Sequence, residues 1–315
     1  MSPMKKIITG ISAALLIFTL SAAARAEAGR PAAVYMTAAI TPQGLVKVYD
    51  ALGVSPAGKT AVKISIGEPG SNYLKPELIK DLVRKVNGTI VECNVAYGTR
   101  RSATPMHYRV AEEHGYTKIA GVDILDGEAS MRLPVRGGRH LKYNLVGANF
   151  KNYDYYVILS HFKGHAIAGF GGAIKNISIG LGSANGKVLI HSGGRSSVVF
   201  GGQKQEDFLE SMGETGKSVV ESLKGHILYI SVMNSLSVDC DCNGSPAEPD
   251  MHDIGILASM DPVALDQACV DLVYAAKDGA SLIKRMEERN GLHTLEYAEQ
   301  IGLGSRKYTL VKIDK

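Results

Sequence analysis

The sequence predicts an α/β protein with a mixed, largely parallel sheet and flanking helices. Short apolar runs typical of buried strands alternate along the chain with amphipathic helical stretches. No internal repeat or low-complexity linker interrupts this alternation. The chain has 315 residues, 45% of them hydrophobic and 21% charged, which is ordinary for a globular protein. A net charge of +4 without a block of basic residues argues against nucleic acid as the partner.

The N-terminus has the three parts of a secretory signal peptide. Lys5 and Lys6 precede an apolar run at residues 7–20, and an A-x-A cleavage site ends at Ala26. The apolar run is too short to span a bilayer comfortably. We therefore expect a signal peptide at residues 1–26 and a periplasmic or secreted protein that is not stably inserted in the membrane after cleavage.

Residues 27–315 are expected to form a single domain, which begins with a β-α-β unit. Pro76 and Gly88 stand near the start and just past the end of an amphipathic stretch, which is typical of a helix. A β-α-β unit implies parallel strands and a right-handed crossover. The elements expected in this half are strand 61–66, helix 76–86, strand 89–95, helix 104–113 and strand 121–125.

The second half continues the alternation. Residues 126–152 are polar and punctuated by glycine, and they predict a hairpin or an excursion from the sheet. Asp261 and Pro262 are typical of a helix N-cap and first turn. Residues 278–315 are expected to form a small helical part that ends in a strand. The elements expected here are strand 155–159, helix 206–223, strand 227–233, helix 263–276, one or two helices and strand 308–313.

The glycine-rich segment 160–194, directly after strand 155–159, is the candidate active-site loop. Functional loops follow strand ends in α/β sheets, and glycines let the backbone approach a ligand. Imidazole binds nickel, zinc, copper or iron and also transfers protons, while lysine can act as a nucleophile or a tether. A structural turn with solvated histidines is the alternative. The candidate groups are His161, His165, Lys175 and His191, and the expected cofactor-binding residues are Gly169, Gly171, Gly172, Lys175 and Asn176.

A second candidate site lies at Cys240, Cys242 and His252. Thiolates with a nearby imidazole select zinc, copper or iron–sulfur chemistry. In an extended segment residues two apart point to the same side, so both sulfur atoms would face one ion while Asp241 faces away.

Two alternatives remain open for these cysteines. Cys240 and Cys242 are too close in sequence for an easy mutual bridge, so a disulfide would join one of them to Cys93 or Cys269. The other alternative is an acidic, solvated surface loop.

The third candidate is the arginine pair Arg100 and Arg101, which follows strand 89–95. Paired guanidinium groups at a strand end suit a carboxylate or a phosphate, and ordinary surface charge is the alternative. The sequence has neither a P-loop nor a G-x-S-x-G nucleophile elbow.

Several motifs resemble the domain-of-unknown-function family 362, whose members are often labelled iron–sulfur center proteins. The resemblance extends over nearly all of residues 27–315. This sequence lacks the ferredoxin-like cysteine cluster that some members carry as an insertion. The matching motifs are GEP at 67–69, ECNxAYG at 92–98, SHFKGH at 160–165, AGFGGAIKN at 168–176, CDC at 240–242 and DIGILASxDPVALDQAC at 253–269.

The glycine-rich segment also resembles, more distantly, lactate racemases that use a nickel-pincer nucleotide. The racemases carry a histidine, an A-G-F-x-G-G-x-K motif and a later histidine, in the order of His165, Lys175 and His191 here. This resemblance implies that Lys175 tethers the cofactor, His191 binds the metal and His165 transfers protons. Where the racemases have a Gly-Thr-His-Arg motif, this chain has Arg100 in place of the second acid–base histidine.

These observations predict a metal- or cofactor-dependent enzyme that acts on a small anionic substrate. In this hypothesis His165 transfers protons, Arg100 and Arg101 hold a carboxylate, and Lys175 and His191 hold the cofactor. The metal is iron (in an iron–sulfur centre), nickel or zinc. The alternatives are a metal-binding or iron–sulfur electron-transfer module, and an exported solute-binding or structural domain without catalysis.

Overall fold

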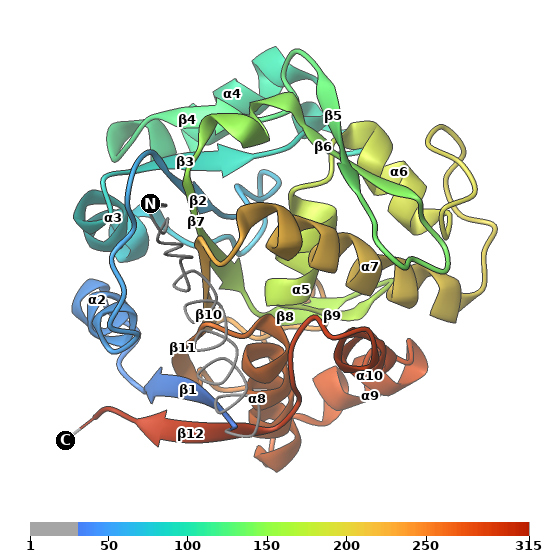
Figure 1. The fold of residues 1–315 in the computed structure, drawn as a ribbon. Helices are drawn as coiled ribbons and strands as arrows, with labels where there is room; N and C mark the ends of the chain where they lie inside the picture. Colours follow the sequence, from blue (N-terminus) through green and yellow to red (C-terminus); the bar gives the residue numbers. More distant parts are fainter. Residues whose placement is uncertain (1–30, 315) are drawn as a thin grey trace, which may run out of the picture. The chain divides into compact units, whose positions relative to one another are not determined.

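An eight-stranded sheet runs through the structure (Figure 1). The computed structural model describes residues 31–314, so the predicted signal peptide at 1–26 lies outside the described residues. Strand β11 is antiparallel to both neighbours, and every other neighbouring pair is parallel, which confirms a mixed, largely parallel sheet. In spatial order the strands are β12 (Tyr308–Lys312), β1 (Ala32–Thr37), β11 (Gly255–Ser259), β10 (Ile227–Met233), β7 (Tyr155–His161), β2 (Thr60–Lys63), β3 (Gly88–Glu92) and β4 (Val122–Ile124).

The predicted β-α-β unit is present as β2, helix α3 (Pro76–Lys85) and β3, and its two strands pair in parallel. Both strands end earlier than predicted, β2 at Lys63 and β3 at Glu92. Beyond these residues the chain leaves the ladder, and Ser65 and Val95 line the cavity described below. The sheet thus stops where the candidate site begins.

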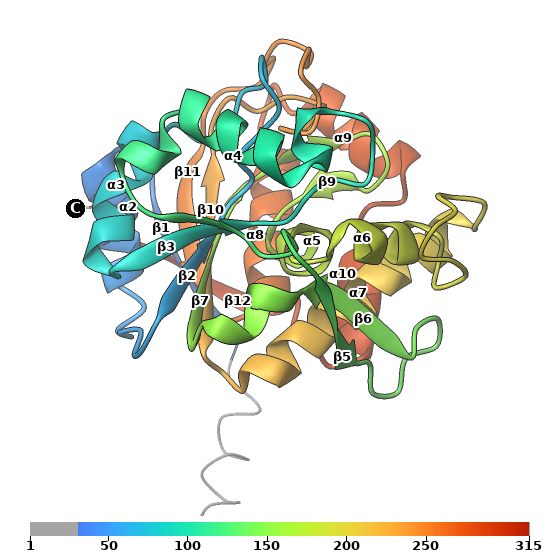
Figure 2. The ribbon, with the colours of Figure 1, turned by 90° about the horizontal axis from the view of Figure 1, so that it is seen from above.

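Alternating side chains of the central strand β7 fill two separate cores, one on each face of the sheet. Tyr156 and Ile158 belong to one core, and Val157 and Leu159 to the other. A strand buried on both faces reads as a continuous apolar run, which is why YYVIL stood out in the sequence. Helices α2 (Pro42–Asp50), α3 and α4 (Thr104–Glu113) cover the second face, and α7 (Gln205–Leu223) and α8 (Pro262–Ala275) the first (Figure 2).

Outside residues 160–194, the remaining elements are a hairpin, two C-terminal helices and three short turns. The excursion predicted at 126–152 contains an antiparallel hairpin of β5 (Ser130–Pro134) and β6 (Tyr143–Gly147). Near the C-terminus, α9 (Ala280–Glu288) and α10 (His293–Gln300) precede β12, which returns to the sheet beside β1. Among residues 31–314 no helix is long and apolar enough to cross a membrane. The short 3₁₀ turns are Arg100–Ser102, Tyr116–Lys118 and Ala148–Asn152.

The glycine-rich segment 160–194 is more regular than the loop expected from the sequence. It contains the hairpin of β8 (Lys163–His165) and β9 (Gly169–Gly171), the short helix α5 (Ala173–Lys175), a π-helical turn at Asn176–Gly180 and helix α6 (Ala184–His191). Buried apolar side chains between the glycines, such as Ile174 and Ile177, anchor these elements to the core. The segment therefore positions its polar side chains on fixed backbone.

Candidate functional site

A cavity of about 220 Å³ lies at the carboxyl ends of β2, β3 and β7. Lys63, Glu92 and His161 line it, and each is the last residue of its strand. Ligands of open α/β sheets bind at this edge. The cavity is smaller than the roughly 300–1,000 Å³ of sites for drug-sized ligands, so it favours a small molecule.

Most of the predicted site residues meet in this cavity. Three do not line it, namely Arg100, Gly169 and His252, and we return to the first and last of these below. The predicted residues that line the cavity are His161, His165, Gly171, Gly172, Lys175, Asn176, His191, Arg101, Cys240 and Cys242.

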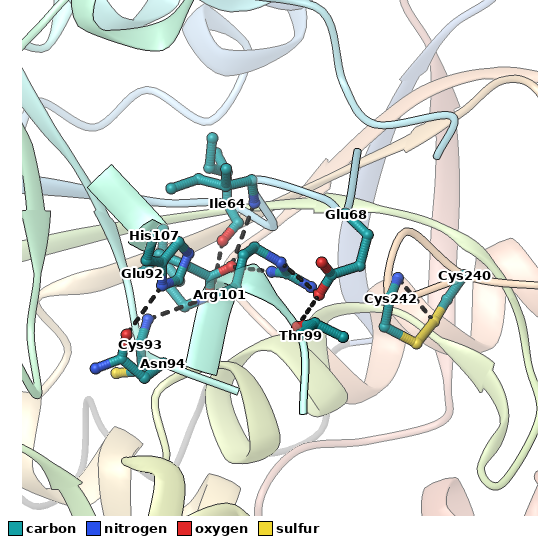
Figure 3. A network of polar contacts seen from close by, with 12 residues as sticks. Ile64, Glu68, Glu92, Cys93, Asn94, Thr99, Arg101, His107, Cys240 and Cys242 are labelled. Carbon is teal, nitrogen blue, oxygen red and sulfur yellow. Dashed lines mark hydrogen bonds and ion pairs between the residues drawn. A yellow bond between two sulfur atoms is a disulfide. The ribbon is translucent and has the colours of Figure 1, made fainter. Parts of the chain in front are cut away.

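The wall on the β2–β3 side is a buried ion network that the sequence did not reveal (Figure 3). Glu92 accepts hydrogen bonds from Lys63 at 2.9 Å and from Arg101 at 3.3 Å, and Arg101 also donates to Glu68 at 2.9 Å. Burial by itself would raise the pKa of Glu92, but the charges of Lys63 and Arg101 outweigh it and lower the pKa to about 2. Glu92 is therefore a permanent anion that holds two cations in place.

This network corrects the role predicted for the two arginines. The side chain of Arg101 is 2% exposed, and its guanidinium donates hydrogen bonds to Glu68, Glu92 and the hydroxyl of Tyr97. Arg100, its neighbour in the 3₁₀ turn, faces outward and makes a bidentate pair with Glu113 at 2.6 and 2.7 Å. Both guanidinium groups are thus engaged with carboxylates of the protein, Arg101 inside the wall of the cavity and Arg100 on the surface.

His161 was predicted as a metal ligand, but both of its ring nitrogens are occupied. Nδ1 lies 3.1 Å from the carboxylate of Asp241, and Nε2 lies 2.8 Å from the carbonyl oxygen of Asn234. Both partners are hydrogen-bond acceptors, so each ring nitrogen faces a group of the protein rather than a metal. His161 instead positions Asp241 together with Lys163, whose ammonium lies 2.8 Å from that carboxylate.

Cys240 and Cys242 are joined to each other by a disulfide. The expectation that they would pair with Cys93 or Cys269 is wrong, because those two thiols are free and buried. Asp241 turns away from the sulfur atoms into its ion pairs with His161 and Lys163. These ion pairs of Asp241 hold the turn at residues 240–242 in place, and both cysteines line the cavity.

The imidazole near these sulfur atoms is that of His165, not His252. A ring nitrogen of His165 and the two sulfur atoms lie within 4.8 Å of one another. The side chain of His252 is 59% exposed and bonds to Asp278 at 2.8 Å, so the predicted grouping with Cys240 and Cys242 does not form. Sequence proximity misled here because the intervening residues 243–250 run over the surface.

Backbone groups set opposite tautomers for the two other histidines of the cavity. Nδ1 of His165 accepts hydrogen bonds from the N–H groups of Ile167 at 3.1 Å and Ala168 at 2.9 Å, so the ring proton is on Nε2. Nδ1 of His191 instead donates to the carbonyl oxygen of Lys187 at 2.7 Å, which leaves a lone pair on Nε2. His191 can therefore bind a metal, whereas His165 is built to donate a hydrogen bond.

The donor role of His165 differs from the proton transfer expected of it. Burial and the nearby charge of Lys175 hold the pKa of His165 well below its ordinary value, so the ring stays neutral. A neutral ring with its proton on Nε2 polarises a substrate oxygen or stabilises an anion without itself taking up a proton.

Lys175 is the last residue of α5 and has no side-chain hydrogen bond or ion pair with residues 31–314. Burial, together with the charges of Lys63 and Lys187, lowers the pKa of Lys175 to about 8. The carboxylate of Asp266 fixes α5 by accepting from the N–H groups of Ala173 and Ile174 at 2.7 and 2.9 Å.

Gly172 makes this arrangement possible, because a Cβ atom at this position would collide with the Asp266 carboxylate. The glycine-rich sequence before Lys175 thus permits a close approach that aims the lysine into the cavity.

A model for the domain of unknown function DUF362 matches residues 60–271. The chain belongs to the DUF362 family. The match contains the cavity-lining residues and every strand of the eight-stranded sheet except β1 and β12. A search of curated proteins finds no match.

Two solved structures resemble this DUF362 protein. One is the lactate racemase apoprotein from Thermoanaerobacterium thermosaccharolyticum, with 14% identity and a TM-score of 0.45 over 76% of this chain and 56% of that one. The other is a protein from Thermotoga maritima, with 12% identity and a TM-score of 0.39 over 82% of this chain and 58% of that one. The DUF362 protein spans less than two thirds of either chain.

Several cavity-lining residues of this DUF362 protein were not predicted from the sequence. Lys63 and Glu92 had one available signal, since a charged residue at the end of an apolar strand points to the ligand-binding edge of the sheet. No sequence signal indicated Lys187 or Phe200. They reach the cavity from helix α6 and from the loop after it, not from the end of a strand.

Phe200 is expected to control the protonation of His191. Its ring stacks on the imidazole with centroids 4.6 Å apart, and burial lowers the pKa of His191 to about 4. In Phe200→Ala water reaches the imidazole, so this pKa should rise toward the ordinary value of about 6.5. NMR titration of the imidazole protons measures the shift. Val198→Ala, which trims an exposed side chain of the same loop, is the control, and an unchanged pKa near 4 in Phe200→Ala would contradict the expectation.

Proposed function

We propose that the cavity is the active site of an exported enzyme that acts on a small anionic substrate with the help of a bound metal or cofactor. The observation that carries this proposal is Lys175, a half-buried cation in a small cavity without a counter-ion among residues 31–314. A charge that is partly removed from water and has no partner is costly, and an anionic ligand would lower that cost.

The balance of charge around the cavity supports the same conclusion. Five cationic side chains of the described residues line it against two carboxylates, those of Glu92 and Asp241. Lys63, Lys163 and Arg101 are neutralised by these carboxylates and Glu68, whereas Lys187 donates to the carbonyl oxygen of Gly182 at 2.6 Å. The cationic lining residues are Lys63, Arg101, Lys163, Lys175 and Lys187.

The donors present fit a metal or metal-bearing cofactor at His191 and Lys175. Nε2 of His191 has a free lone pair, and an amine with a pKa of about 8 is partly unprotonated near neutral pH, as a covalent tether requires. A metal bound there would supply Lewis-acid polarisation of a substrate oxygen. Lys175 would orient the anion, and the Nε2–H of His165 would donate to the oxygen that gains charge.

Racemisation is not part of the proposal. It needs proton or hydride partners on two sides of the substrate, and the residue at the second position is Arg100, which is turned to the surface and paired with Glu113.

An iron–sulfur centre does not fit the residues either. Such clusters are held by about four thiolates. Here Cys240 and Cys242 are oxidised, and neither Cys93 nor Cys269 lines the cavity. An iron–sulfur electron-transfer module therefore has no support from the described residues.

Calorimetry with the purified mature protein tests the proposal. Oxalate, lactate and inorganic phosphate are the probes, and elemental analysis of the same sample for nickel, zinc and iron tests the metal. We expect a small carboxylate to bind with one site per chain. A protein that binds none of the probes and contains no metal would contradict the proposal.

Export is tested separately by N-terminal sequencing of protein from the cell envelope. We expect the chain to begin directly after Ala26. An intact Met1 on the soluble mature protein would contradict export by a cleaved signal peptide.

A further inference from the structure

The Cys240–Cys242 disulfide lies on the wall of a cavity that a small molecule can enter, which is unusual for a bridge that only stabilises a fold. It closes a ring over a single intervening residue, so it constrains little of the unfolded chain. The other two cysteines are inert by comparison, because both are buried and burial raises the pKa of their thiols. Among residues 31–314 the bridge thus holds the two cysteines that are not buried.

The surroundings of the bridge suit a thiolate. The backbone N–H of Cys242 donates to the sulfur of Cys240 at 3.3 Å. His165 lies within 4.8 Å of both sulfur atoms, and its Nε2 carries the ring proton because backbone donors occupy Nδ1. Lys175 adds an unneutralised positive charge to the same cavity. Hydrogen-bond donors and positive charge lower the pKa of a thiol and make it a better leaving group.

The turn that carries the cysteines is held independently of the bridge. The carboxylate of Asp241 is paired with His161 and Lys163, and its backbone carbonyl accepts from the N–H of Glu68 at 2.8 Å. After reduction these contacts would keep the two sulfur atoms close together and facing the cavity. Such a pair can open and close again without a change in the fold.

We propose that Cys240–Cys242 is a redox-active disulfide that exchanges electrons with a dithiol, such as a protein with a reduced Cys-x-x-Cys pair. A thiolate of the dithiol attacks the sulfur of Cys242, the S–S bond breaks and Cys240 leaves as a thiolate held by the Cys242 N–H and His165. The second thiol of the dithiol then attacks the mixed disulfide. Two electrons and two protons pass to the cysteine pair, and the dithiol becomes a disulfide. This activity goes beyond the proposed function and does not depend on it.

Reduction of the native protein is the first test. We expect dithiothreitol to expose two thiols that react with a maleimide, mapped by mass spectrometry to Cys240 and Cys242, while Cys93 and Cys269 react only in denaturant. A glutathione redox titration followed by acid quenching then gives the equilibrium constant. A bridge that opens only when the protein is unfolded would overturn the proposal.

Single cysteines test the assigned roles. In Cys242→Ser the remaining Cys240 should react with iodoacetamide at pH 7 about tenfold faster than Cys242 does in Cys240→Ser, which corresponds to about one pKa unit. Adding His165→Phe to Cys242→Ser should slow Cys240 about tenfold and move its pH profile upward. Equal rates for both cysteines, or a profile that His165→Phe leaves unchanged, would overturn the roles. The calorimetric assay with small anions on the oxidised protein reports on the proposed function separately.

Discussion

Replacing Lys175 by methionine is expected to weaken the binding of a small carboxylate about 10- to 100-fold. Among the cations that line the cavity, this ammonium is the one without a hydrogen-bond or ion-pair partner in residues 31–314, and a hydrogen bond to a charged group contributes about 1.5–3 kcal/mol. Because the pKa of Lys175 is about 8, the wild-type affinity should also fall as the pH rises from 7 to 9 and the cation is lost. Calorimetry with oxalate over this pH range measures both effects.

Lys284→Met is the matched control for Lys175→Met. Lys284 is an exposed lysine of α9 that interacts only with Glu288 one turn away, so its removal should not change the affinity. Lys175→Met with wild-type affinity, or binding that does not depend on pH, would show that the anion is held by other groups. Circular dichroism of both variants excludes a loss of folding as the cause.

The second large effect is expected for stability. Glu92→Gln removes the charge that Lys63 and Arg101 share, and breaking a buried ion pair costs about 3–5 kcal/mol. The pKa of Glu92 is lowered from 4.5 to about 2, so its stabilising effect is complete above about pH 4.5 and is lost as the pH falls toward 2. The difference between wild type and Glu92→Gln should therefore narrow at low pH. Urea denaturation at pH 7 and pH 3 measures it.

Glu113→Gln provides the control for this experiment. Glu113 also pairs with an arginine, but the pair is on the surface, where exposed ion pairs contribute little. Its replacement should leave the urea midpoint almost unchanged. If Glu92→Gln is as stable as Glu113→Gln at pH 7, the buried network does not stabilise the fold.

The elements around the site could be predicted because their signals are local. The apolar runs of β7 and β10, and the helix boundary at Pro76 and Gly88, depend on residues within one element. Strand ends in a parallel sheet converge on one edge, so the meeting of Lys175 and His191 with the other candidates could also be foreseen. The edge strand β12 was predicted at 308–313, but β1 and its partner β11 were not expected as strands.

The state of each candidate side chain could not be foreseen, because it depends on partners that are distant in sequence. Arg101 is bound by Glu68, 33 residues away, and His161 is bound by Asp241, 80 residues away. Cys240 and Cys242 likewise flank Asp241, whose carboxylate pairs with the distant Lys163 on the β8–β9 hairpin.

The sequence by itself determined the α/β class, the parallel β-α-β unit, the strand edge at which the site lies and ten of the residues that line it. Only the tertiary structure decided which of those side chains are paired with carboxylates of the protein: Arg101 and His161 are, whereas Lys175 and His191 are not within residues 31–314. The physical reason is that apolar periodicity specifies secondary structure locally, while the charge and hydrogen-bonding capacity of a buried polar group are set by whichever donors and acceptors the fold brings within about 3 Å of it.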